Sequence, residues 1–139
     1  MKNWFWGNIA ILEPKPDMKK LILTRDSVSM GDDAFDHTLE IEIKEEWKIN
    51  EILDKVIQIN YLPKIMGGKA TWSVAYDKPL AIIAQQSSTP KLIGMSEDFP
   101  YQGTKWHVNI ERLHFNYHAQ QDPELVYDVL NRFHVVRKG

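Results

Sequence analysis

The segment from His37 to Lys44 constrains the fold most strongly, because apolar and polar residues alternate through it without interruption. Two sets of three residues alternate here, one apolar and one polar: Leu39, Ile41 and Ile43, and Thr38, Glu40 and Glu42. Successive side chains of a strand point to opposite faces of its sheet, so one set faces a core and the other faces water. The segment therefore predicts a half-buried strand with its glutamates on the outer face.

Further strands are predicted wherever short apolar stretches end in turn-forming residues. They cover residues 4–12, 20–24, 70–76, 80–85 and 106–117, with a short strand near Leu92-Ile93. Residues 77–79, which include a proline, predict a hairpin between two of them. Within 106–117 the apolar positions change parity, which predicts a β-bulge near Glu111-Arg112.

Two helices are predicted, and together with the strands they define the fold class. The first begins at Asn50 as N-cap and ends before Pro63, and the second opens at Asp122-Pro123. The second helix carries an apolar stripe that we expect to be buried: Leu125, Val126, Val129, Leu130 and Phe133. The sequence thus predicts one α+β domain over residues 1–139, with a single mostly antiparallel sheet of about six strands and two helices. A domain of this size buries roughly 68% of its unfolded surface.

Negative charge is concentrated between residues 26 and 54. This segment holds ten of the 19 Asp and Glu residues but only two of the 17 Lys and Arg residues, a local net charge of −8 in a chain whose total is −2. A field of one sign attracts a cationic partner. It repels nucleic acid, which is bound by Lys and Arg, so direct nucleic-acid binding is disfavoured. A merely solvated acidic face is the alternative interpretation.

The carboxylates around the alternating strand are the predicted partner-contact residues. They are contiguous in sequence, so we expect them to share one surface: Asp32, Asp33, Asp36, Glu40, Glu42, Glu45 and Glu46. Such a surface would accelerate association with a basic protein, up to roughly 10⁸–10⁹ M⁻¹s⁻¹ at low salt.

Residues that could support metal chemistry give a competing hypothesis. Asp26, Asp32 and Asp33 supply hard oxygen ligands for a metal-dependent enzyme, but the segment lacks the spacing of a calcium loop. His114 and His118 are four residues apart, which in a strand separates them by about 13 Å, too far to share a zinc ion. The chain contains no cysteine, so thiolate sites and disulfides are excluded. We expect no metal and no cofactor.

The glycine pair and the tryptophans give the remaining hypotheses. Gly67-Gly68 superficially resembles a phosphate-binding loop, but the first glycine is missing and a strand is predicted where a helix should follow. The pair therefore predicts a turn. A small-ligand-binding module built around Trp72, Tyr101 and Trp106 is a third possibility, although a core position is the more common role of a tryptophan.

The sequence also bears on location. No apolar run approaches the roughly 20 residues that cross a bilayer, and the absence of cysteine fits a reducing compartment. A cytoplasmic protein without membrane contacts is the resulting prediction.

Several stretches between residues 21 and 86 resemble one family of small bacterial proteins. They are Leu23-Thr24-Arg25-Asp26-Ser27-Val28-Ser29-Met30-Gly31-Asp32-Asp33, Tyr61-Leu62-Pro63, Gly67-Gly68-Lys69-Ala70-Thr71-Trp72 and Ala84-Gln85-Gln86. The family is that of immunity proteins of polymorphic toxin systems, including contact-dependent growth inhibition. The resemblance implies a non-catalytic protein that binds a cognate toxin and blocks its active site. Many such toxins are nucleases with basic clefts, for which an acidic surface is complementary.

Overall fold

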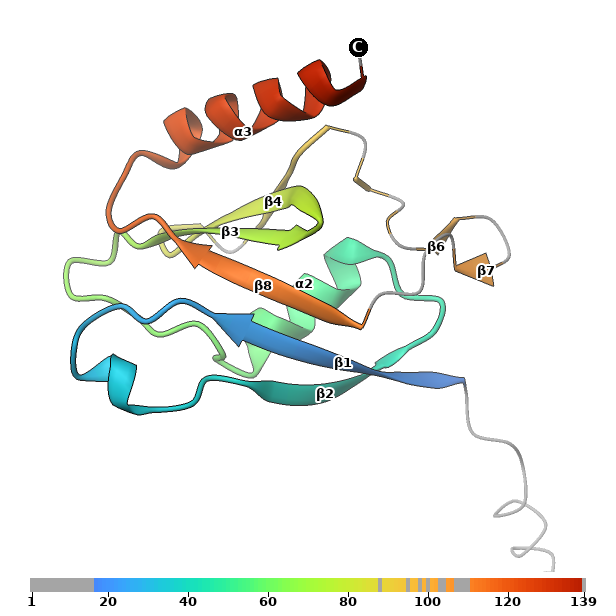
Figure 1. Cartoon of the computed structure of the whole chain (residues 1–139), viewed down its shortest axis with the longest axis horizontal. Helices are drawn as coiled ribbons and strands as arrows, with labels where there is room; N and C mark the ends of the chain where they lie inside the picture. The colour runs from blue at the N-terminus through green and yellow to red at the C-terminus, as the bar shows by residue number, and fades with distance from the viewer. Residues whose placement is uncertain are drawn as a thin grey trace, which may run out of the picture.

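The computed structural model describes residues 17–87, 89–94, 96–97, 99, 101–102, 105–106 and 111–138. The predicted first strand over residues 4–12 lies outside this part of the chain. A six-stranded sheet forms the centre of the structure, in the order β2-β1-β8-β3-β4-β5 (Figure 1). The strands are β1 Met18–Arg25, β2 Leu39–Lys44, β3 Thr71–Tyr76, β4 Lys78–Ala84, β5 Lys91–Leu92 and β8 Arg112–Tyr117.

The predicted α+β class is confirmed. Every neighbouring pair in the sheet is antiparallel except β1 and β8, which run parallel. Two α-helices accompany the sheet, α2 over Ile49–Gln58 and α3 over Pro123–Lys138. A short 3₁₀ helix, η1 over Asp32–Ala34, lies between β1 and β2.

The prediction of one long strand over residues 106–117 was wrong. Its first residue belongs to β7, Lys105–Trp106, which pairs with β6, Tyr101–Gln102, in a separate two-stranded sheet. Glu111 is in no strand, and β8 starts at Arg112 in the main sheet. Residues 107–110, through which the first apolar parity continues, lie outside the described part of the chain. The register shift that the structure does contain lies between Val74 and Ala75, where β3 pairs with β4.

The main core lies between one face of the sheet and α2. Alternation places Leu21, Leu23, Ile41 and Ile43 on this face with at most 8% exposure. Helix α2 contributes four fully buried residues at helical spacing: Ile49, Ile52, Leu53 and Val56. Burying each such side chain contributes about 1.5–3 kcal/mol relative to leaving it exposed. This packing fixes the position of β2, whose opposite face then points its glutamates into solvent.

Helix α2 begins at Ile49, two residues earlier than an N-cap at Asn50 predicts. Lys48 is the N-cap, and its backbone N–H donates to Glu51 Oε1 at 2.8 Å. The backbone N–H of Ile49 donates to the carbonyl of Phe99 at 2.6 Å. Because the Ile49 side chain is also fully buried, tertiary contacts set the start of the helix rather than the local preference of asparagine for caps.

Helix α3 packs on the other face of the sheet, over β4. Val126 is 6% exposed and contacts a small cluster with Ile82 and Ile93. The prediction of a fully buried stripe was wrong for Leu125 and Val129, which are 59% and 40% exposed. The helix crosses the β4 side of the sheet (Figure 1). The strip of its surface that meets the core is therefore narrower than the predicted apolar stripe. Phe133 lies outside the described side chains.

The part of this sheet face that β2, β1 and β8 form carries mainly polar side chains: Lys20, Thr24, Glu40, Glu42, Arg112, His114 and Asn116.

Before β3 begins, Gly67 and Gly68 have φ of 94° and 72°, a left-handed backbone that glycine adopts without strain. The predicted turn is confirmed there. In the described part of the chain no helix has both the length and the apolar character that crossing a bilayer requires.

Candidate functional site

Six of the seven predicted contact residues are exposed along one edge of the molecule. Strand β2 is the edge strand of the sheet, with η1 before it and the turn into α2 after it (Figure 1). We call this surface the acidic edge, and its members are Asp33, Asp36, Glu40, Glu42, Glu45 and Glu46. A strand of six residues is about 20 Å long, so the acidic edge is a strip with loop carboxylates at one end and turn carboxylates at the other.

Lysines neutralise only part of the acidic edge. Lys20 Nζ lies 3.7 Å from Glu40 Oε2, and both side chains are more than half exposed. Such a surface pair contributes little. Lys55 Nζ donates to the backbone carbonyl of Glu42 at 2.7 Å and leaves that residue's carboxylate unpaired. Within the described residues, no ion pair involves Asp33, Glu42, Glu45 or Glu46, so the strip remains negative.

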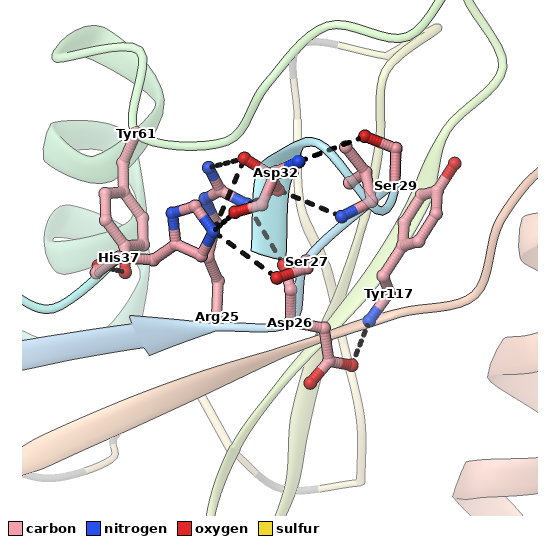
Figure 2. A network of polar contacts seen from close by, with 9 residues as sticks. Arg25, Asp26, Ser27, Ser29, Asp32, His37, Tyr61 and Tyr117 are labelled. Atoms are coloured by element: carbon pink, nitrogen blue, oxygen red, sulfur yellow. Dashed lines mark hydrogen bonds and ion pairs between the residues drawn. The ribbon is translucent and has the colours of Figure 1, made fainter. Parts of the chain in front are cut away.

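Asp32 differs from the other predicted contact residues, because its carboxylate is committed within the loop (Figure 2). Its Oδ2 accepts from Arg25 Nη1 at 2.8 Å and from the backbone N–H of Val28 at 2.9 Å. The Arg25 and Asp32 side chains are only 10% and 18% exposed. The hydrogen bond from Arg25, followed by that from Val28, lowers the pKa of Asp32 to about 2. Asp32 therefore organises the loop that presents its neighbours.

Further contacts tie the loop between β1 and β2 to Tyr61, which follows α2. The hydroxyl of Tyr61 donates to the carbonyl of His37, and the Arg25 guanidinium lies 6.0 Å from the Tyr61 ring centre. Burial is the main cause that raises the pKa of Tyr61 to about 12, so its hydroxyl stays a donor at neutral pH. His37 Nε2 lies 2.9 Å from the carbonyl oxygen of Asp32. These contacts hold the loop in place within the chain itself.

Asp36 and Thr38 join the loop to β2. Asp36 Oδ1 accepts from the backbone N–H of Thr38 at 2.9 Å. This hydrogen bond is the largest cause that lowers the pKa of Asp36. The residue is therefore both exposed and held in one orientation, as a docking contact requires.

Asp26 points away from Asp32 (Figure 2), and its carboxylate links the end of β1 to β8. Its two carboxylate oxygens accept from the backbone N–H of Tyr117 at 2.9 Å and face His114 Nε2 at 2.9 Å. Asp26 and Asp32 thus have separate partners. Among the described residues no three His, Asp or Glu side chains are placed to hold a metal ion. The alternative of a metal-dependent enzyme built on Asp26, Asp32 and Asp33 therefore has no ligand set in this part of the chain.

A hydroxyl–imidazole–carboxylate chain escaped sequence analysis. Thr24 Oγ1 lies 2.8 Å from His114 Nδ1, whose ring continues to Asp26. The parallel register of β1 and β8 creates it by placing Thr24 opposite His114, 90 residues away. This order of groups resembles a nucleophilic relay. However, both ring nitrogens face β1, whereas the shallow groove beside His114 lies toward β3 and does not include Thr24. These contacts join β8 to β1 and to the residue that follows β1.

The second histidine of this face has its own partner. His118 Nε2 lies 2.8 Å from the hydroxyl of Ser73, a residue that is 3% exposed. Burial lowers the pKa of His118, which favours the neutral imidazole. His114 and His118 therefore act as polar residues of one sheet face, in accordance with their predicted strand spacing.

Of the residues proposed for a small-ligand module, Trp72 belongs mainly to the core. It is 2% exposed, and its ring centre lies 4.8 Å from that of Tyr117. The side chains of Tyr101 and Trp106 are outside the described part of the structure.

Comparisons of the chain with protein-family models, curated proteins and solved structures found no match. The resemblance to immunity proteins therefore stays a prediction.

Proposed function

We propose that this protein is an immunity protein, which binds a cognate toxin domain in the cytoplasm and neutralises it without catalysis. The observation that carries the proposal is the acidic edge, a strip of exposed carboxylates of which Asp33, Glu42, Glu45 and Glu46 have no ion-pair partner among the described residues. The partner that fits this surface is a basic protein, and a nuclease is the class we favour.

Charge complementarity explains how such a complex would inhibit a nuclease. A nuclease cleft carries Lys and Arg that neutralise phosphates. Carboxylates that enter this cleft occupy the same cationic groups and exclude the nucleic acid. They also accelerate encounter, because complementary potentials steer two proteins together before contact.

The construction of the loop supports the same proposal. Asp33 and Asp36 flank the network of Asp32, Arg25 and His37, which is formed within the free protein. A preformed contact surface loses less conformational entropy on binding than a flexible one. A standard interface of roughly 1,600 Å² in total would accommodate a strip of this length.

The test uses the C-terminal domain of the polypeptide encoded immediately upstream as the binding partner. Calorimetry would measure its affinity for the unaltered protein and for a triple variant, Glu42→Lys, Glu45→Lys and Glu46→Lys. We expect a loss of about 100-fold or more, because like charges would now face each other. Nuclease activity of the partner should be suppressed by the unaltered protein and restored with the variant.

A matched control separates the acidic edge from net charge. Glu97→Lys, Glu111→Lys and Asp128→Lys change the total charge equally, at exposed positions outside the acidic edge. We expect these substitutions to weaken binding by about threefold or less. Equal losses in both triple variants, or no loss in either, would exclude the acidic edge as the docking surface.

A further inference from the structure

A second candidate site lies at the C-terminal end of α2. It is a pocket of about 360 Å³, which is within the size range of small-molecule sites. Three segments form its walls: the end of α2 with the following loop, Trp72 on β3, and the end of β4 with the following turn. The lining residues are Ile57, Asn60, Leu62, Pro63, Lys64, Trp72, Ile83, Ala84, Gln85, Gln86 and Ser87. We call it the Trp72 pocket.

The inner part of the Trp72 pocket is apolar and firmly packed. Trp72 and Ile83 are 2% and 5% exposed, and Tyr117 supports the indole ring from behind. Ile57 and Leu62 add apolar side chains that pack against the same core. Because Trp72 and Ile83 expose so little surface, the apolar surface that a ligand could remove from water is mainly that of the half-buried Ile57, Leu62 and Pro63.

Gln85 fixes the wall that the loop after α2 forms. Its Oε1 accepts from the backbone N–H groups of Ile65 and Ala70 at 3.0 and 3.2 Å, and its Nε2 donates to the carbonyl of Ile65 at 3.2 Å. One side chain thus holds the loop at three points. The pocket is therefore preformed, as ligand sites usually are.

The polar groups of the pocket determine the charge of its ligand. Asn60, Lys64 and Gln86 line it, and their side chains form no hydrogen bond or ion pair with another described residue. None of the lining residues is Asp or Glu. Lys64 is therefore the one charged group in the lining, and it is exposed. An apolar cavity with a lysine and two amides is complementary to an apolar molecule that carries one negative charge.

We propose that the Trp72 pocket binds a small aromatic or aliphatic carboxylic acid. The apolar part lies mainly against Ile57, Leu62 and Pro63, with the buried Trp72 and Ile83 beneath them, and the carboxylate is held by Lys64. This function is independent of the acidic edge, because the two sites share no residue and carry opposite charge.

The test compares 2-naphthoate with the neutral 2-naphthamide as probes. Each would be titrated into the full chain labelled with ¹⁵N, with chemical shifts followed at the backbone of Gln85 and Ser87 and at the indole N–H of Trp72. We expect saturable shifts at these positions and tighter binding of the carboxylate. Lys64→Gln should weaken 2-naphthoate about fivefold and leave 2-naphthamide unchanged. Lys69→Gln, in the same loop but outside the pocket lining, is the matched control and should change neither.

Ala84→Leu provides a second variant, because a larger side chain in the lining should abolish binding of both probes while the melting temperature shows that the fold is kept. If Ala84→Leu does not fold, the comparison of Lys64→Gln with Lys69→Gln still tests the proposal. Binding of 2-naphthoate that Lys64→Gln leaves unchanged would overturn the proposal. Shifts confined to the exposed α3 residues Leu125 and Val129, or no saturable shifts, would overturn it as well. Charge reversal on the acidic edge should not alter probe binding. A negative result for one proposed function would therefore leave the other one standing.

Discussion

The acidic edge and the Trp72 pocket show two ways in which one chain builds a binding surface. The acidic edge comes from a single continuous stretch, residues 33–46, whose carboxylates face water. Within β2 they do so because the alternating strand buries the residues of the other parity, Ile41 and Ile43. The pocket comes from three segments that only the folded sheet brings together. The comparison teaches that a charged surface can follow from local periodicity, whereas the shape of a cavity depends on tertiary packing.

The two regions also differ in the force that would hold a partner. Exposed charges are screened by salt, with a Debye length of about 8 Å at physiological ionic strength. Burial of apolar surface is not screened in this way.

Trp72→Ala should have the largest effect on stability, because the side chain belongs to both the core and the pocket. Truncation of a buried aromatic residue costs about 3–5 kcal/mol. Urea denaturation monitored by circular dichroism would measure the loss. Trp47→Ala is the control, since Trp47 is only half-buried and should cost clearly less. Equal losses would contradict the assignment of Trp72 to the core.

Asp32→Asn should lower the melting temperature at pH 7 by less than Trp72→Ala does. Because the folded-state pKa of Asp32 is lowered to about 2 from 3.8, its contribution to stability is present above the unfolded value and lost as the pH falls toward 2. The melting temperatures of variant and unaltered protein should therefore converge between about pH 5 and pH 2. Thermal unfolding across this range would measure the effect.

The neighbouring residue gives the control for that experiment. Asp33 is exposed and has no side-chain partner in the described structure, so Asp33→Asn should leave the melting temperature unchanged at each pH. If Asp33→Asn instead reproduced the pH dependence expected of Asp32→Asn, the loop network would not be the cause.

Glu51→Gln should have the smallest of these effects, about 0.5–1 kcal/mol, because it weakens the bond to the Lys48 N–H at the start of α2. Asp54→Asn is the matched control, since Asp54 is exposed on the same helix and its side chain forms no hydrogen bond with another described residue. Chemical denaturation would measure both. A loss from Asp54→Asn as large as that from Glu51→Gln would assign the effect to general helix charge.

The sequence was sufficient for the elements whose pattern is local. The alternation through residues 38–43 predicted β2 and the burial of Ile41 and Ile43, although Leu39, at the start of the strand, is 39% exposed. The glycine pair Gly67-Gly68 predicted a turn, because a turn depends on a few neighbouring residues. The fold class followed from the same patterns.

The parts that sequence analysis missed depend on contacts between distant segments. Leu125 and Val129 fit a buried stripe, but α3 meets only the β4 side of the sheet. Asp32 was grouped with its acidic neighbours, although Arg25 and the N–H of Val28 hold its carboxylate in the loop. The role of Gln85 in shaping a pocket required knowledge of where Ile65 and Ala70 lie.

The salt dependence of the association rate tests the central claim most directly. Stopped-flow mixing with the proposed partner, the C-terminal domain of the polypeptide encoded immediately upstream, would measure this rate between about 50 and 500 mM salt. We predict that the rate of the unaltered protein falls about tenfold or more over this range. We also predict that the Glu42, Glu45 and Glu46 lysine variant associates slowly at every salt concentration. An association rate of the unaltered protein that does not change with salt would contradict docking through the acidic edge.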